Sequence, residues 1–123
     1  MVSNRIDDNN TTISYFKKDV DKFVEERSWK KYHTPKNLIQ ALGIEVAELS
    51  EIFLFRDYDI EKIHEDNKLM ENISDEIADI FIYLLSLVNC LNIDLTKIFI
   101  RKMEKNRKKY SHREFNNGSF YKK

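Results

Sequence analysis

Residues 75–91 read D-E-I-A-D-I-F-I-Y-L-L-S-L-V-N-C-L, a run that is apolar on nearly every side from Ile77 onward. The apolar pattern begins earlier, and the whole segment from about residue 68 to 91 is predicted to form one helix. Helices that are apolar almost all round are typical of a bundle interior or a subunit interface. The stretch therefore predicts a helical protein in which this helix is central.

Two helices are predicted before this segment. Residues 11–32 carry apolar side chains three and four positions apart, with Thr11 or Thr12 as the N-cap. Thr34 followed by Pro35 is a recognised helix start, and the helix that begins there is predicted to run to about residue 55. Its apolar stripe is broad enough to face more than one neighbour.

A connection is predicted before the central helix, and a fourth helix is predicted after it. Residues 56–67 are charged and weakly patterned, which indicates a connection with about one helical turn. Asn92 and Asp94 mark a break and a new cap. A helix is predicted from about Asp94 to Tyr110, and it becomes strongly basic toward its end.

The four predicted helices suggest an all-α four-helix bundle, and the composition agrees with such a fold in one domain. The chain has 123 residues but only two glycines and one proline, too few turn residues for a protein rich in hairpins. We expect a flexible N-terminus over residues 1–10, a helical domain over 11–111, and a flexible or partner-ordered tail over 112–123.

Charge and cysteine content narrow the classes of partner. Lysine plus arginine and aspartate plus glutamate number 21 each, so no net charge attracts the whole protein to nucleic acid or to an acidic membrane surface. No apolar stretch resembles a signal peptide or a membrane span, which favours a cytoplasmic protein. The single cysteine, Cys90, cannot form an intrachain disulfide and is predicted to be a small buried residue.

Four polar residues interrupt the apolar helix on one side. Glu76, Asp79, Tyr83 and Ser86 are spaced by three, four and three positions, so they line one helix face. Burying carboxylates costs several kcal/mol each unless a cation or a hydrogen-bonding partner compensates. A bound metal ion would supply that compensation.

Glu45 and Glu48 form a second acidic pair, three positions apart on the preceding helix. The alternative is that such pairs are simply solvated, since acidic residues are frequent on these helices. If the two pairs converge, four carboxylates without histidine or cysteine form an all-oxygen site, which suits Mg²⁺ or Mn²⁺ rather than zinc or copper. Magnesium in turn suggests a phosphate substrate.

Donor and aromatic groups that could complete such a site occur elsewhere in the chain. Basic and amide side chains share a face of the last helix at Lys102, Asn106 and Lys109, with Arg107 alongside. Aromatic side chains that could stack on a base are Trp29, Tyr32, His33, Phe55 and Tyr83. The alternative for the basic side chains is a solvated helix end, and the alternative for His33 is a capping or surface histidine. The residues assigned to the core are Phe23, Phe53, Phe81 and Phe99.

The order of these motifs resembles the MazG-like nucleotide pyrophosphohydrolases, and within them the dCTP pyrophosphatase branch. The resemblance rests on four blocks: F-V-E-E-R-S-W-K-K-Y-H-T-P-K-N-L (23–38), E-V-A-E-L-S-E-I-F (45–53), D-E-I-A-D-I-F-I-Y-L (75–84) and K-M-E-K-N-R-K-K-Y (102–110). Two positions depart from the family pattern. Ile44 precedes Glu45 where many members have a second glutamate, and Phe55 stands where the dCTP branch usually has tryptophan.

The resemblance implies a function and a role for each motif. It implies Mg²⁺-dependent hydrolysis of a (deoxy)nucleoside triphosphate, dCTP or a modified dCTP, to the monophosphate and pyrophosphate, for clearing unwanted nucleotides. Homo-oligomers, dimers or tetramers, would complete the core and the active sites. The implied metal ligands and catalytic residues are Glu45, Glu48, Glu76 and Asp79; phosphates would bind near Lys102, Asn106, Arg107, Lys109 and Tyr110, and base and sugar near Trp29, His33, Asn37, Phe55 and Tyr83.

Three other functions are alternatives to nucleotide hydrolysis. A di-iron carboxylate bundle requires E-x-x-H on two helices, and only Glu61 with His64 matches. Nucleic-acid binding is disfavoured by the neutral overall charge and by the lack of a known motif. The remaining alternative is a non-enzymatic helical module that mediates oligomerisation, which would show no magnesium dependence.

Overall fold

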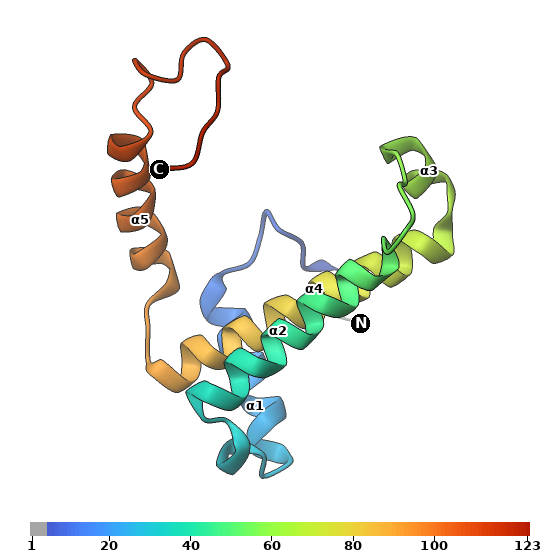
Figure 1. Cartoon of the computed structure of the whole chain (residues 1–123). Helices are drawn as coiled ribbons and strands as arrows, with labels where there is room; N and C mark the ends of the chain where they lie inside the picture. The colour runs from blue at the N-terminus through green and yellow to red at the C-terminus, as the bar shows by residue number, and fades with distance from the viewer. Residues whose placement is uncertain (1–4) are drawn as a thin grey trace. The chain divides into compact units, whose positions relative to one another are not determined.

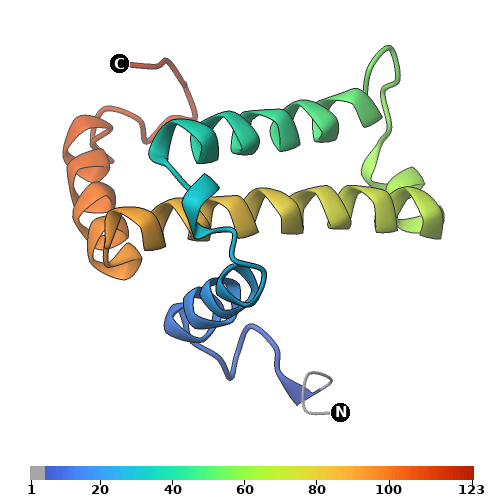
Figure 2. The same ribbon diagram turned by 90° about the horizontal axis from the view of Figure 1, so that it is seen from below.

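The computed structural model describes residues 5–123, and all regular secondary structure in this range is helical (Figures 1 and 2). Residues 1–4, part of the predicted flexible N-terminus, lie outside the described residues. The all-α class predicted from the sequence is confirmed. The elements are α1 (Ile13–Glu26), a short 3-10 helix η2 (Lys30–Tyr32), α2 (Pro35–Ile52), α3 (Ile60–Glu65), α4 (Asn67–Leu91) and α5 (Leu95–Lys109).

Polar side chains fix where the helices begin. Thr12, Thr34 and Asp94 each accept a hydrogen bond from the backbone N–H three residues further on, at 3.1, 3.2 and 2.9 Å. Such caps satisfy one of the free N–H groups of the first helical turn. All three residues are among the caps expected from the sequence, so these helix starts are confirmed.

The ends of two helices differ from the sequence-based prediction. The helix that begins at Pro35 was expected to reach about residue 55, but α2 ends at Ile52. The first helix was expected to reach Tyr32, but α1 ends at Glu26 because Ser28 adopts a left-handed backbone with φ of 55°. A residue in that conformation cannot continue a right-handed helix, so the chain resumes as η2. The segment expected to be a connection contains α3, a complete short helix capped by Asp59.

The chain divides into two compact parts, one ending at Asn92 and one beginning at Ile93. In the first part α4 is central, since α1, α2 and α3 all pack against it and α2 runs beside it (Figures 1 and 2). α4 ends at Leu91, and its C-cap Asn92 takes the left-handed conformation with φ of 54°. The buried apolar side chains are Val24, Leu38, Leu69, Ile73, Leu85 and Val88.

The second part consists of α5 and a non-helical segment that folds back on itself. The Phe115 ring lies 5.4 Å from the ring of Tyr110 and 4.9 Å from that of Tyr121, measured between centroids. The backbone N–H of Lys123 donates to the Tyr110 hydroxyl at 2.8 Å, and Glu114 contacts both Lys123 and Tyr121. The predicted domain bounds, and a tail that a partner orders, stay predictions.

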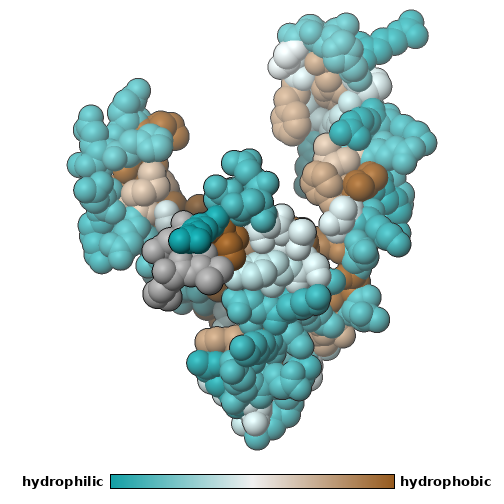
Figure 3. Space-filling model, turned by 180° about the vertical axis from the view of Figure 1, so that it is seen from behind, coloured by the Kyte–Doolittle hydropathy of each residue, from teal (hydrophilic) through white to brown (hydrophobic). Residues whose placement is uncertain are grey.

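Several apolar residues expected in the core are exposed. Phe23 is 47% and Phe99 63% exposed, and Cys90 is exposed too, so these three predictions were wrong. Phe53 and Phe81 are half-buried. Apolar faces of α2 and α4 also reach the surface, as at Ile44 (58%) and Ile77 (54%), and brown patches are visible in Figure 3. Even so, no single helix within residues 5–123 is long and apolar enough to cross a membrane.

Candidate functional site

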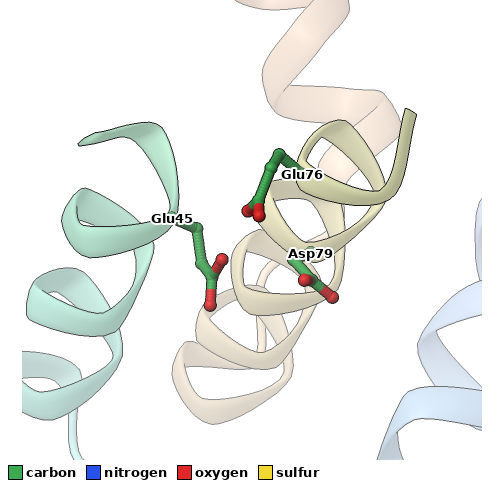
Figure 4. Close-up of side chains that lie close together, drawn as sticks. All are labelled: Glu45, Glu76 and Asp79. Atoms are coloured by element: carbon green, nitrogen blue, oxygen red, sulfur yellow. The ribbon is translucent and has the colours of Figure 1, made fainter. Parts of the chain in front are cut away.

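Three carboxylates from two helices converge in the first part of the chain. Glu45 projects from α2, and Glu76 and Asp79 project from successive turns of α4 (Figure 4). One carboxylate oxygen from each lies within 4.8 Å of the others. Because residues three apart share a helix face, the close packing of α2 on α4 is sufficient to bring these side chains together.

The electrostatic environment of this group is unfavourable for three negative charges. Oε2 of Glu45 and Oε2 of Glu76 are buried and have no hydrogen-bond partner within residues 5–123. The pKa of Glu45 rises from 4.5 to about 7, first because of burial, then through hydrogen bonding with the Glu76 side chain and through the charge of Glu48. Glu48 thus lies beside Glu45, although it is not one of the three converging residues.

The three carboxylates fit a hard divalent cation. Two oxygens on opposite sides of Mg²⁺ lie about 4.1 Å apart, given bonds of about 2.0–2.1 Å, so a separation of 4.8 Å needs only a small side-chain adjustment. A cation would also satisfy the two unpartnered oxygens, and its charge would offset the burial and the repulsion that raise the pKa of Glu45. An all-oxygen donor set selects magnesium or manganese over softer metals.

The raised pKa of Glu45 predicts a pH-dependent affinity for the cation. Below about pH 7 this carboxyl is protonated, and the proton must leave before a metal ion binds. We therefore expect the affinity for Mn²⁺, measured by calorimetry, to rise about tenfold between pH 6 and pH 8. Glu45→Gln should bind weakly with little pH dependence, whereas equal wild-type affinity at both pH values would contradict the prediction.

A large pocket lies next to the carboxylate group. It has a volume of about 1020 Å³ and is lined mainly by apolar residues of α1 and α4. Glu45 and Asp79 form part of its wall, as do three residues predicted to bind a base or sugar: Trp29, His33 and Tyr83. Partial burial lowers the pKa of His33, which favours the neutral imidazole. The structure thus places the carboxylate group next to a pocket with aromatic residues in its wall.

Other predicted site residues do not line this pocket. Asn37 donates its side-chain amide to the Tyr32 carbonyl at 3.0 Å and so stabilises the start of α2. Phe55 lies just beyond α2, is 98% exposed and has a left-handed backbone with φ of 58°. The predicted phosphate-binding residues belong to the second part of the chain; Lys102, Asn106, Arg107 and Lys109 lie on α5, and Tyr110 is its C-cap. The roles of all these residues stay predictions.

The contribution of α1 to the pocket was not predicted from the sequence. Phe16, Val20 and Phe23 line the pocket, together with Asp19. The apolar residues were predicted only as the stripe of an amphipathic helix, with Phe23 in the core. Ser86 also lines the pocket; it was placed in the polar stripe of α4 without a role, and its hydroxyl donates to the Ile82 carbonyl at 3.1 Å.

Comparison with known proteins agrees with this arrangement. Residues 41–121, which include the three converging carboxylates, match the model of the MazG-like family. The chain belongs to the MazG-like family. Proteins that it resembles include dCTP pyrophosphatase 1 of Rattus norvegicus, 37% identical over 90 residues, which are 72% of this chain and 52% of that protein. The protein of the same name from Homo sapiens is 36% identical over 90 residues, again 72% and 52%.

The chain spans about half the length of these relatives. Among solved structures, a pyrophosphatase from Archaeoglobus fulgidus DSM 4304 is similar, with a TM-score of 0.73 and 38% sequence identity. That similarity covers 86% of this chain and 98% of the archaeal chain. The resemblance inferred from the ordered sequence motifs is therefore confirmed at the level of the family.

Proposed function

We propose that this chain hydrolyses a nucleoside triphosphate, dCTP or a modified dCTP, to the nucleoside monophosphate and pyrophosphate, in a reaction that depends on Mg²⁺. The observation that carries the proposal is the group formed by Glu45, Glu76 and Asp79 beside a pocket containing Trp29 and Tyr83. The names of the two mammalian relatives and of the archaeal protein support the same reaction.

In this proposal the four acidic residues divide the chemistry between them. Glu45, Glu76 and Asp79 hold Mg²⁺, or Mn²⁺ in its place, which when bound neutralises charge on the phosphates and on the departing pyrophosphate. Glu48, exposed beside Glu45, accepts the proton of the water that attacks the α-phosphorus. The bond between that phosphorus and the oxygen bridging to the β-phosphate then breaks, and no covalent enzyme intermediate forms.

The remaining predicted residues bind the rest of the substrate. Trp29, His33 and Tyr83 line the space for base and sugar. Phosphate binding is assigned to Lys102, Asn106, Arg107 and Lys109 of α5 and to its C-cap Tyr110. Asn37 and Phe55 are assigned to base and sugar binding because the family resemblance implies that role. Planar guanidinium and ammonium groups suit phosphate oxygens because they donate several charged hydrogen bonds.

We further propose that the protein is a cytoplasmic homo-oligomer, a dimer or tetramer, that removes unwanted nucleotides from the cell's pool. Exposed apolar residues on both central helices support oligomerisation, among them Ile39 (56%), Ile44 (58%) and Ile77 (54%). Exposed apolar patches of this kind mark interaction surfaces. Covering them with a second copy would remove apolar area from water and stabilise the assembly.

The proposal is tested by measuring pyrophosphate release from canonical and 5-modified nucleoside triphosphates, with Mg²⁺ and with EDTA. We expect release that requires Mg²⁺ and is fastest for dCTP or one of its modified forms. Release of orthophosphate instead of pyrophosphate would show a different bond being cleaved. The absence of release from every triphosphate would overturn the proposal and favour a non-enzymatic oligomerisation module, whose exposed apolar faces need no metal ion.

A further inference from the structure

The pocket-facing side of α1 is apolar except at one position. Phe16, Asp19, Val20 and Phe23 follow one another at spacings of three, one and three, and all four line the large pocket. Side chains at these spacings share one face of a helix. Asp19 therefore brings a carboxylate into a wall that is otherwise made of aromatic and aliphatic groups.

The Asp19 side chain is not used elsewhere in the fold. It forms no hydrogen bond or ion pair within residues 5–123, in contrast to Asp21, whose carboxylate lies 3.2 Å from Lys30 Nζ. It is also outside the group of carboxylates that fits a cation. A carboxylate in an apolar wall, with both oxygens available, is suited to accept hydrogen bonds from a ligand in the pocket.

We propose that Asp19 determines base preference by accepting a hydrogen bond from the exocyclic amino group of cytosine. The inference rests on the proposed function. Phosphates are repelled by a carboxylate and are attracted by the cation that Glu45 and Asp79 hold from α2 and α4. The group that faces Asp19 on α1 is then the base, which the aromatic lining of the same pocket also favours.

Hydrogen-bond chemistry makes this contact selective among pyrimidines. Cytosine presents an N4 amino donor, and carboxylates are its common partners in proteins. Uracil and thymine present the O4 acceptor at the equivalent position, so a carboxylate would face a second acceptor with no proton between them. The cost of such unpaired polar groups in an apolar pocket is what generates discrimination.

Asp19→Asn is the sharpest test because an amide can either donate to O4 or accept from N4. We expect the ratio of kcat/KM for dCTP to that for dUTP to fall about tenfold or more in Asp19→Asn, chiefly through slower dCTP and faster dUTP turnover. Asp19→Ala should lower dCTP turnover without the gain for dUTP. Asp21→Asn, the same change on the same helix, should leave the ratio as in wild type.

A binding measurement separates this inference from the proposed reaction. Dissociation constants for non-hydrolysable α,β-imido analogues of dCTP and dUTP should show the same loss of preference in Asp19→Asn. An unchanged ratio in an active Asp19→Asn enzyme would overturn the inference and leave the reaction standing. Loss of preference in Asp8→Asn but not in Asp19→Asn would also overturn the inference, because Asp8 is another carboxylate in the pocket lining. A wild-type protein that hydrolyses no triphosphate would overturn the proposed function itself.

Discussion

Replacing Asp79 by asparagine is expected to lower Mg²⁺-dependent pyrophosphate release by about 10²–10³-fold. Asp79 supplies one of the three converging oxygens, and asparagine keeps its shape while removing its charge. Metal ions stabilise transition-state charge by several kcal/mol, and each 1.36 kcal/mol corresponds to about tenfold in rate. The loss should appear in kcat/KM and should be only partly recovered at high Mg²⁺ concentration.

Asp75→Asn provides the matched control for this experiment. Asp75 is exposed on the same helix, next in sequence to Glu76, but belongs neither to the carboxylate group nor to the pocket lining. Its amide variant should retain wild-type release. If Asp79→Asn kept more than a tenth of the wild-type rate while binding Mn²⁺ normally, the assignment of Asp79 as a ligand would be wrong.

Glu45→Gln is expected to raise the melting temperature of the metal-free protein and to lower it relative to wild type when Mg²⁺ is present. Because the pKa of Glu45 is raised to about 7 in the folded protein, its ionisation destabilises the fold progressively as pH rises from about 4.5 to about 7. The amide cannot ionise, so the metal-free variant should melt several degrees higher than wild type at pH 8; about 1 kcal/mol corresponds to about 4–8 °C in a domain of 60–100 residues. At pH 4.5 the two should melt alike.

With Mg²⁺ wild type should melt at a higher temperature than Glu45→Gln, because the variant lacks one of the metal ligands. Wild type should gain stability with Mg²⁺ concentration through binding to the folded state, whereas Glu45→Gln should gain little and should release pyrophosphate at least about 100-fold more slowly. Glu51→Gln, an exposed position on the same helix, is the control and should change neither melting nor release. A Glu45→Gln variant that is less stable than wild type at pH 8 without metal would contradict the electrostatic explanation.

Local sequence signals predicted the starts of three helices well. Thr12, Thr34 and Asp94 cap helices because their side chains bond to the backbone only three residues away, an interaction that sequence spacing specifies. The ends of helices were harder to predict. The early end of α1 depends on the left-handed conformation of Ser28. Glycine is the usual residue in that conformation at a helix end, so a serine there gives no clear sequence signal.

Features that depend on tertiary packing could be predicted only in part. Periodicity identified the apolar face of α1 but not what covers it, so Phe23 was assigned to the core although it lines the pocket and is 47% exposed. The position of Asp19 in the pocket lining could not be predicted either, because periodicity does not show which side of α1 faces a pocket. The convergence of Glu45 with Glu76 and Asp79 was expected, because the two acidic helix faces were predicted to meet. Glu48 lies beside Glu45 but outside the converging group, and this depends on the packing of α2 against α4.

The two halves of the carboxylate group lie on α2 and α4, and their register is set by the direct packing of these helices. The segment joining them, residues 53–66 with α3, contributes none of the three carboxylates. Lengthening a surface loop adds little to its closure entropy, about 0.6 kcal/mol for each doubling. Evolution is therefore free to insert or delete residues in this joining segment and so to diversify the surroundings of the site, while the spacing of its ligands stays constant.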